Sequence, residues 1–385
     1  MNNKQVPEIR FKEFSKEWNF CILKDMLIIS RGERITKKSV QNSGYPIISG
    51  GTGIFGYYKD FNRNPNIITI AQYGSAGFVN LQKEKFWAND VCYCIDTKNV
   101  IDNYFMYSFL LSKQLYIYSL VNNNAIPSSI SSESIYNIQI PKIDNDEALK
   151  IGKFFLTLNN LIALYKKKCE KLEIIRKSLI ENVFIDLGFN QPNIRFKEFN
   201  SKWINKTFSE LYKKNTVKNS NLKYDENNVI SVANMYFKSD VKISNEEYLK
   251  TYNIFKIGDI AFEGNKSKNF TCGRFVENTI GDGIISHVFE VFSPIIEYDL
   301  WFWKYLINNE KIMKNILMKS TKATTMMSNL VSKDFLEQKI KLPELKEQTK
   351  IGILLNTISY NITLCKRKCE KLENIKKSLL EKMFI

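Results

Sequence analysis

Two stretches of the chain carry apolar residues at a seven-residue repeat, which predicts two long helices that pair as a coiled coil. They span residues 147–185 and 347–385. One seam position is occupied by Ile151, Leu158, Tyr165, Leu172 and Leu179 in the first stretch, and by Ile351, Ile358, Cys365, Leu372 and Leu379 in the second. The other seam position is occupied by Phe154, Leu161 and Ile175 in the first stretch, and by Leu354 and Ile375 in the second.

Lysine interrupts the second seam once in each stretch, at Lys168 and Lys368. A polar seam residue can fix register and orientation at some cost in stability. Alternatively, the lysine stem packs while its amine reaches solvent. The pattern leaves both interpretations open. At 1.5 Å per residue, each helix would be on the order of 50 Å long.

The two stretches are copies of one another. Residues 147–185 and 347–385 match without a gap, and more than half of their positions are identical. A shorter leader is also repeated, since "PEIRFKEFSKEW" (7–18) returns as "PNIRFKEFNSKW" (192–203) with most positions identical. Such repeats indicate an internal duplication. Each copy consists of a leader, a middle region and a long helix, and the middle regions do not align easily with each other.

The duplication predicts how the helices run. A short link joins the first helix to the second leader, and the second middle region leads directly into the second helix. If that unit is compact, the second helix starts where the first ends and returns antiparallel to it. The chain would then form a pseudo-twofold arrangement in which Ile385 lies beside the first leader and Ile185 lies near the second.

The middle regions, 19–146 and 204–346, have short alternating strands and turns followed by short helices. We therefore predict an α+β fold: two mixed α/β domains joined by two long antiparallel coiled-coil helices, with a pseudo-twofold internal duplication. The predicted divisions are a first domain at 1–146, a central helix at 147–185, a second domain at 186–346 and a C-terminal helix at 347–385.

Charge points to a polyanionic partner. The formal net charge is +16, and the excess is spread along the chain instead of being concentrated in a tail. A spread surplus suits an extended nucleic-acid surface, although it also suits ordinary solubility. No segment resembles a membrane span or a signal peptide, so we expect a cytoplasmic protein without membrane contact.

The seven cysteines contain no C-x-x-C motif. We expect reduced, structural thiols and no metal site. Cys92 and Cys94 lie on a predicted strand, with their side chains expected on opposite faces. Cys365 and Cys369 lie four apart on a predicted helix, with no histidine nearby to complete a metal site.

Several stretches partly match catalytic or cofactor-binding motifs, but none has the complete pattern. Gly51, Gly53 and Gly56 match a dinucleotide fingerprint, but no helix is predicted to follow them. Residues 258–267 have the wrong spacing for a phosphate loop, and the single histidine, His287, cannot form a histidine-based triad or zinc site alone. The Asp334, Glu344 and Lys346 spacing is a loose nuclease-like match of a kind common in Lys/Glu-rich chains. We therefore expect no catalysis from this chain.

The chain resembles the specificity subunit of type I restriction–modification systems over its whole length. The resemblance rests on the two leaders, the junction "LPELKEQTKIGILLNTI", the pattern "ITIAQYGSAGFV" with "FWAND", and the long helices. It implies two target-recognition domains that each read half of a bipartite, asymmetric DNA site. It also implies that the helices set the spacing and dock methyltransferase subunits.

The resemblance further implies a non-catalytic DNA-recognition subunit of a multisubunit restriction endonuclease and adenine methyltransferase. Its partners would be double-stranded DNA, two methyltransferase subunits and, through them, motor-nuclease subunits. This chain would hold no cofactor, and S-adenosylmethionine, ATP and Mg would bind on the partners. Ala148 stands where the second copy has Gln348, so the two ends need not dock partners identically.

DNA-contact residues should be polar or basic loop residues that reach base edges or phosphates. In the first domain the candidates are Arg31, Arg34, Lys37, Lys38, Gln72, Tyr73 and Ser75. In the second they are Asn265, Lys266, Ser267, Lys268, Arg274 and Lys322. Each could equally be a solvated loop residue.

Two other classes of protein remain open. One is a duplicated coiled-coil adaptor that binds protein partners. Divergence of the middle regions disfavours it, because a symmetric adaptor has little reason to differ on both faces. The other is a nuclease or methyltransferase in a single chain, which the absent motifs disfavour.

Overall fold

The computed structural model describes residues 6–98, 100–185, 189–239, 246–323 and 327–385. The chain divides into two compact units. Unit 1 comprises residues 1–167 and 366–385, and unit 2 comprises residues 168–365. Helices α4 (Asn145–Asn182) and α9 (Leu345–Met383) each contribute one segment to each unit. Within the described residues, no helix is both long and apolar enough to cross a membrane.

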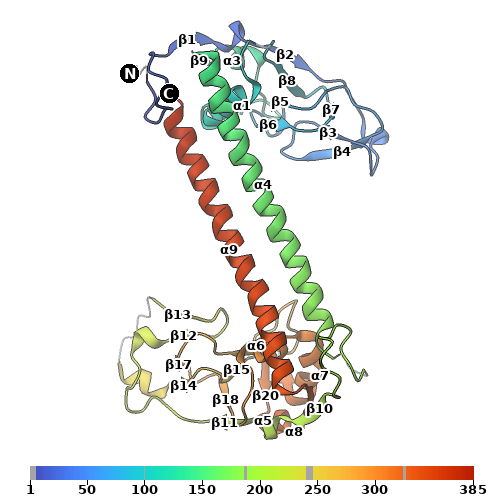
Figure 1. Cartoon of the computed structure of the whole chain (residues 1–385), viewed down its shortest axis with the longest axis vertical. Helices are drawn as coiled ribbons and strands as arrows, with labels where there is room; N and C mark the ends of the chain where they lie inside the picture. The colour runs from blue at the N-terminus through green and yellow to red at the C-terminus, as the bar shows by residue number, and fades with distance from the viewer. Residues whose placement is uncertain (1–5, 99, 186–188, 240–245, 324–326) are drawn as a thin grey trace. The chain divides into compact units, whose positions relative to one another are not determined.

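Unit 1 is built around a four-stranded antiparallel sheet of order β2-β8-β5-β6 (Figure 1). Its strands are β2 (Ile28–Arg31), β8 (Cys92–Asp96), β5 (Ile67–Ala71) and β6 (Val79–Gln82). A second sheet has the order β4-β3-β7, with β4 (Ile54–Tyr58), β3 (Tyr45–Ile48) and β7 (Trp87–Ala88). Strand β1 (Asn19–Ile22), directly after the leader, pairs antiparallel with β9 (Gln139–Lys142). The shorter helices are η1 (Leu23–Asp25), η2 (Lys37–Ser39), α1 (Asn103–Ser112), α2 (Gln114–Ser119) and α3 (Ser132–Tyr136).

Unit 2 repeats this plan. Its four-stranded sheet has the order β11-β18-β15-β16, from β11 (Tyr212–Asn215), β18 (Glu290–Pro294), β15 (Ile260–Glu263) and β16 (Arg274–Glu277). Strand β10 (Ile204–Thr207) pairs with β21 (Lys339–Leu342), as β1 pairs with β9. The other strand pairs are β12 (Ile230–Ser231) with β13 (Tyr236–Phe237), β14 (Asn253–Phe255) with β17 (Gly283–Ile285), and β19 (Thr321–Ala323) with β20 (Ser328–Leu330). The shorter helices are α5 (Phe208–Leu211), η3 (Glu226–Asn228), η4 (Glu246–Thr251), α6 (Leu300–Ile307), α7 (Glu310–Ser320) and α8 (Ser332–Glu337).

The two long helices run antiparallel in each unit, as predicted. In unit 1, the Phe155 and Phe384 rings lie 5.8 Å apart, and Lys166 pairs with Glu373 at 2.6 Å. As the residue number increases along α4, the residue number of its contact in the second helix decreases, which is the pattern of antiparallel helices. In unit 2, the Cys169 thiol lies 3.7 Å from the Ile362 carbonyl oxygen.

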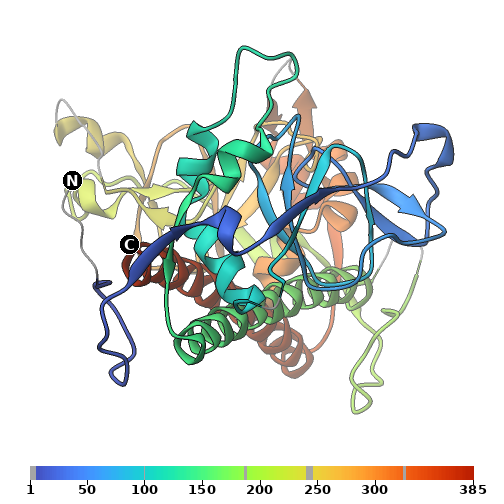
Figure 2. The same ribbon diagram turned by 90° about the horizontal axis from the view of Figure 1, so that it is seen from above.

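Each leader is held by the end of a long helix. The Ile9 amide donates to the Lys382 carbonyl at 3.0 Å, and the Ile194 amide donates to the Asn182 carbonyl, also at 3.0 Å. Figure 2 shows the C-terminus close to the first leader. The predicted placement of Ile385 beside the first leader is confirmed, since Phe11 of that leader and Ile385 pack against the same core of unit 1.

The second seam position differs from the prediction. Phe154, Leu161 and Ile175 are 37%, 38% and 48% exposed, whereas the residues that follow the first two, Phe155 and Ile162, are buried. The buried positions of this seam are Phe155, Ile162 and Cys169 in α4, Val183 directly after it, and Leu355, Ile362, Cys369 and Met383 in α9.

Lys168 and Lys368 consequently lie outside the seam and are exposed, and the cysteine after each is buried. The period of seven was right and the phase of this position was wrong by one residue. Where two adjacent residues are both apolar, as at Phe154 and Phe155, either one could occupy the seam. The contact with the other helix determines which of them is buried. The first seam position includes buried Ile151, Leu158, Ile351 and Cys365, with Tyr165, Leu172, Leu179, Ile358, Leu372 and Leu379 partly buried.

One prediction about the cysteines was wrong. Cys92 and Cys94 both belong to the small core cluster that contains Ile48 and Phe86. Residues two apart on a strand point to the same face because side chains alternate with a period of two. Both thiols are free and buried.

Candidate nucleic-acid interface

In unit 1, the ends of three strands bring several predicted contact residues to one end of the main sheet. Strands β2 and β5 both run antiparallel to β8, so Arg31 pairs with Tyr93 and Ala71 pairs with Cys92. The turn at 72–75 follows β5 directly and therefore lies at the end of the sheet where Arg31 ends β2. No local pattern in the sequence predicts that these segments meet.

A loop from later in the chain completes this end of the sheet. The backbone of Tyr73 forms a β-bridge with Ser129, and Ser129 also bridges back to Asn122. The Ile130 amide donates to the Gln72 carbonyl at 3.0 Å. We call the turn at 72–75 together with the loop at 122–129 the unit 1 edge.

Two glycines permit the close backbone packing behind this edge. A Cβ atom on Gly50 would lie 2.4 Å from the Tyr73 carbonyl oxygen. Gly74 has a φ of +74°, a backbone conformation that favours glycine. The Ser75 amide donates to the Gly50 carbonyl at 2.8 Å. Gly50 and Gly74 thus allow the backbone segments to approach each other closely at the unit 1 edge.

Unit 2 builds an edge at the corresponding place. The turn after β15 bridges at Asn265 to Met327, and the Ser328 amide donates to the Gly264 carbonyl at 2.8 Å. A Cβ on Gly264 would lie 2.2 Å from the Ser328 carbonyl oxygen, so this approach also requires glycine. Lys322 lies on β19, where it pairs with Asn329 of β20. We call residues 264–268 together with 321–323 and 327–330 the unit 2 edge.

The predicted contact residues differ in how accessible they are. Arg31, Arg34, Lys37, Lys38, Asn265, Lys266, Ser267, Lys268 and Lys322 are exposed, and Tyr73 and Ser75 are partly exposed. Gln72 is only 5% exposed, and its Oε1 atom has no hydrogen-bond partner among the described residues.

Two of the candidate arginines already make contacts within the protein. Arg274 pairs with Glu263 at 2.7 Å, donates to the Ala233 carbonyl and stacks over Phe270 at 5.0 Å. The guanidinium of Arg31 lies over the Tyr93 ring, 5.8 Å from its centroid. Contact with nucleic acid remains a prediction for every candidate residue. Lys37 and Lys38 lie in η2, away from the turn and loop that form the unit 1 edge in sequence and in backbone pairing.

Sequence reasoning missed a group of lysines in unit 2. A cleft of about 650 Å³ beside β11 is lined by several basic side chains, namely Lys213, Lys214, Lys223 and Lys256. Strand β11 occupies the same place in its sheet as β2, whose end supplies Arg31. The sequence signal for Lys213 and Lys214 is the stretch "KKNTVK" (213–218), which follows the second leader as "RGERITKK" follows the first.

The loop at 122–129 was also missed, because its residues are uncharged. It contains three consecutive asparagines, Asn122 to Asn124, whose amides can donate to and accept from base edges. Among the described residues, no group of three or more His, Cys, Asp or Glu side chains could hold a metal ion.

A duplicated fold with one polar edge in each unit and a surplus of basic residues is typical of a nucleic-acid recognition protein with two recognition domains. A family profile described as "Type I restriction modification DNA specificity domain" matches residues 15–174 and 200–374. The chain therefore belongs to this family and is a type I restriction–modification specificity subunit. Both copies of the duplication are matched separately.

Known relatives agree with this assignment. The chain is 24% identical over 349 residues to the type I restriction enzyme MjaVIII specificity subunit of Methanocaldococcus jannaschii, covering 84% of this chain and 79% of the relative. It is 25% identical over 362 residues to a putative type I restriction enzyme specificity subunit of Haemophilus influenzae, S.HindORF215P, covering 87% and 86%. The crystal structure of the S subunit from M. genitalium shares the fold, with a TM-score of 0.70, 16% identity and 99% coverage of each chain.

Proposed function

We propose that each unit reads one half of a bipartite, asymmetric DNA site through its edge. The observation that carries this proposal is the shared architecture of the edges. Both follow the third strand in the order of the main sheet, and both are completed by a bridge to the loop before the last short helix. Yet Tyr73 and Ser129 in one edge correspond to Asn265 and Met327 in the other. One scaffold with two sets of side chains suits two different half-sites.

Basic groups around the edges would supply affinity and polar groups would supply specificity. Arg31 and the lysines beside β11 can neutralise phosphates without reading sequence. Tyr73, Ser75, Asn265 and the asparagines at 122–124 can bond to base edges.

The chain acts, in this proposal, without catalysing a reaction itself. Methyl transfer and cleavage would come from two methyltransferase subunits and, through them, motor-nuclease subunits, which would bind S-adenosylmethionine, ATP and Mg. The proposal is supported by the exposed apolar side chains on the long helices, which are Leu149, Phe154, Leu161, Leu164, Ile174, Ile175, Ile353, Tyr360, Leu364 and Ile375. Exposed apolar stripes of this kind favour partner helices in a helix-in-groove or bundle contact.

Exchange of one recognition region tests the proposal. Residues 204–346 would be replaced by the matching region of another specificity subunit, and the chain produced with its methyltransferase partner. We expect one half of the methylated sequence to change and the other half to stay, because each edge belongs to one unit. Methylome sequencing measures the site, and the reciprocal exchange of residues 19–146 is the control, which should change only the other half. A change in both halves after a single exchange would contradict independent reading.

A further inference from the structure

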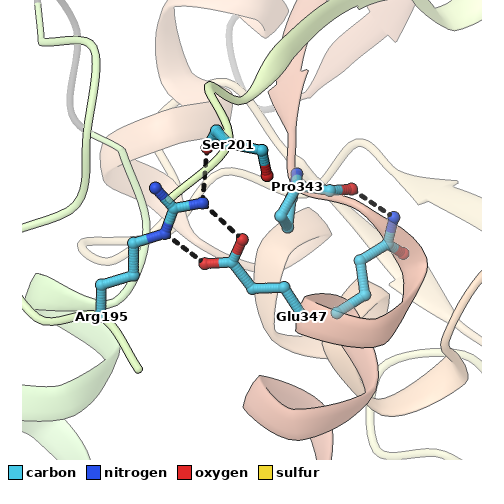
Figure 3. A network of polar contacts seen from close by, with 5 residues as sticks. Arg195, Ser201, Pro343 and Glu347 are labelled. Atoms are coloured by element: carbon cyan, nitrogen blue, oxygen red, sulfur yellow. Dashed lines mark hydrogen bonds and ion pairs between the residues drawn. The ribbon is translucent and has the colours of Figure 1, made fainter. Parts of the chain in front are cut away.

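In each unit, an arginine of the leader binds a glutamate in the first turn of a long helix. Arg10 Nε and Nη2 donate to the two carboxylate oxygens of Glu147 over 2.6 and 2.7 Å. Arg195 Nε and Nη2 donate to the carboxylate oxygens of Glu347, both over 2.8 Å (Figure 3). The glutamate side chains are 1% and 0% exposed. We call these two bidentate pairs the clasps.

Each clasp lies where the chain leaves its recognition domain. Strand β21 ends at Leu342, and Glu347 follows in the first turn of α9. Figure 3 shows Pro343 and Glu347 close together on this junction, with Arg195 and Ser201 approaching from the leader. The clasp therefore joins the leader to the start of the long helix, a few residues after the last strand of the domain.

A second contact holds the same stretch of helix against the domain. A Cβ on Gly152 would lie 2.0 Å from Asp102 Oδ1, and a Cβ on Gly352 would lie 2.1 Å from Asp299 Oδ1. These aspartates cap α1 and α6 through the Phe105 and Phe302 amides. A domain held at two places along one helix has little freedom to tilt on it.

The contacts around the clasps differ between the units, although the clasps themselves are the same. Trp18 Nε1 donates to Glu147 at 3.2 Å in unit 1. In unit 2, Arg195 Nη2 also donates to the Ser201 carbonyl at 2.6 Å, and Gln348 donates to the Pro343 carbonyl at 3.1 Å. The bidentate geometry is thus retained where the surrounding hydrogen bonds have changed.

The hydrophobic core transmits orientation from clasp to edge. In unit 1, one continuous core extends from Ala148 and Ile151 on the long helix to Ile70 on β5, directly before the edge. Closely packed cores move as bodies and do not deform continuously. A small rotation at Glu147 would therefore shift the whole unit 1 edge.

We propose that the clasps are positioning elements that hold each recognition domain at one angle on its helix, and so restrict the spacing accepted between the two DNA half-sites. This inference rests on the proposed function. A clasp that only stabilised the fold would change stability and leave the accepted spacing unaltered. The spacing of methylated half-sites therefore distinguishes positioning from simple stabilisation.

The test uses Arg10→Lys and Arg195→Lys, each produced as the full chain with its methyltransferase partner. Lysine keeps the charge but cannot form the two-bond fork. We expect unchanged half-site sequences, with sites one base pair longer or shorter than the original methylated about tenfold more than by the wild-type complex. The matched control is Lys206→Gln, which breaks the exposed Lys206–Glu210 pair of 2.9 Å in unit 2 and should keep the original spacing.

Folded complexes that accept only the original spacing would overturn the proposal, as would altered half-site sequences. If a lysine variant abolishes methylation, the paired variant Arg10→Gln with Glu147→Gln, which removes the two-bond fork without leaving a buried charge unpaired, provides the second measurement. Methylation that returns with relaxed spacing supports positioning, whereas methylation at the original spacing alone, or none, overturns it. A wild-type complex that methylates no two-part site would instead refute the proposed function, and the clasp inference with it.

Discussion

Buried carboxylates in this chain are accommodated in two ways. Glu147 and Glu347 are paired with arginines, and breaking such a buried pair typically costs about 3–5 kcal/mol because a charge is left without its partner. Glu277 on β16 is 2% exposed. Burial raises the pKa of Glu277 well above its usual range, although the Lys304 ammonium opposes this shift. The raised pKa favours a protonated side chain in the folded protein.

The raised pKa of Glu277 predicts a pH-dependent stability. The folded state holds this proton more tightly than the unfolded chain. The stability that Glu277 contributes is therefore fully present below the unfolded pKa of about 4.3, and it is lost as pH rises through the folded pKa. Glu277→Gln keeps the shape without the charge. We expect it to be more stable than wild type at pH 8, by about 1–3 kcal/mol, and the difference to shrink toward pH 5.

Urea unfolding of both proteins at several pH values measures this difference. The control is Glu297→Gln, since Glu297 is exposed and its substitution should change the free energy of unfolding by less than about 0.5 kcal/mol. A Glu277→Gln variant that is less stable than wild type at pH 8 would show that the folded protein uses the charged carboxylate.

At the residue scale, the sequence could identify classes of contact residue but not their surroundings. Exposed Lys266 and Lys268 follow from polar loop composition. The burial of Gln72 does not, because the segment packed beside it comes much later in the chain, where the Ile130 amide donates to the Gln72 carbonyl. Nor could the sequence pair Arg274 with Glu263, which lie opposite each other on neighbouring strands.

At the element scale, the heptad period was visible in the sequence and the phase of one seam position was not. The sequence offers adjacent candidates, such as Lys168 beside Cys169, and only the contact with the other helix selects between them. The repeated leaders and helices did allow the antiparallel direction to be predicted, because a short link constrains where the second unit begins.

The corrected seam predicts opposite results at adjacent positions of α9. Cys369 is 8% exposed, with its thiol 3.8 Å from the Ile162 carbonyl oxygen in unit 1. Cys369→Lys would bury an ammonium group in the seam and should destabilise the protein by on the order of 3 kcal/mol. Lys368→Cys should change stability by less than about 0.5 kcal/mol, because that position faces solvent. Thermal unfolding compares the two variants, and equal losses would contradict the assigned phase.

At the scale of the whole molecule, the duplication made the arrangement of the long helices predictable. The two edges could not be predicted, because they lie in middle regions whose sequences do not align. The leaders and the long helices repeat without gaps, so the direction of the second long helix could be predicted from the repeat. The two middle regions, 19–146 and 204–346, differ in length, yet both units contain the same order of strands in the main sheet. Each edge is closed by a bridge between segments far apart in sequence, which local patterns do not reveal.

The ungapped match of the long helices suggests that their length matters to the proposed reading of two half-sites. Seven residues inserted into each helix, at equivalent positions, keep the seam in phase and add roughly 10 Å. DNA rises about 3.4 Å per base pair, so the accepted spacer should lengthen by up to about three base pairs. Three extra base pairs would also rotate the new half-site by about a third of a turn around the duplex, which opposes the longer spacer. A smaller change in spacer length, or lost activity, would therefore also agree with helices that set the distance.

Four residues inserted into each helix form the matched control. They break the heptad phase, move buried positions such as Ile162 and Ile362 out of the seam, and should reduce stability more than the seven-residue insertion does. Methylome sequencing of cells that produce each variant with its methyltransferase partner measures the spacer. Full activity of the seven-residue variant on the original spacing alone would show that helix length does not set the distance, because added turns in each helix could not leave a true ruler unchanged.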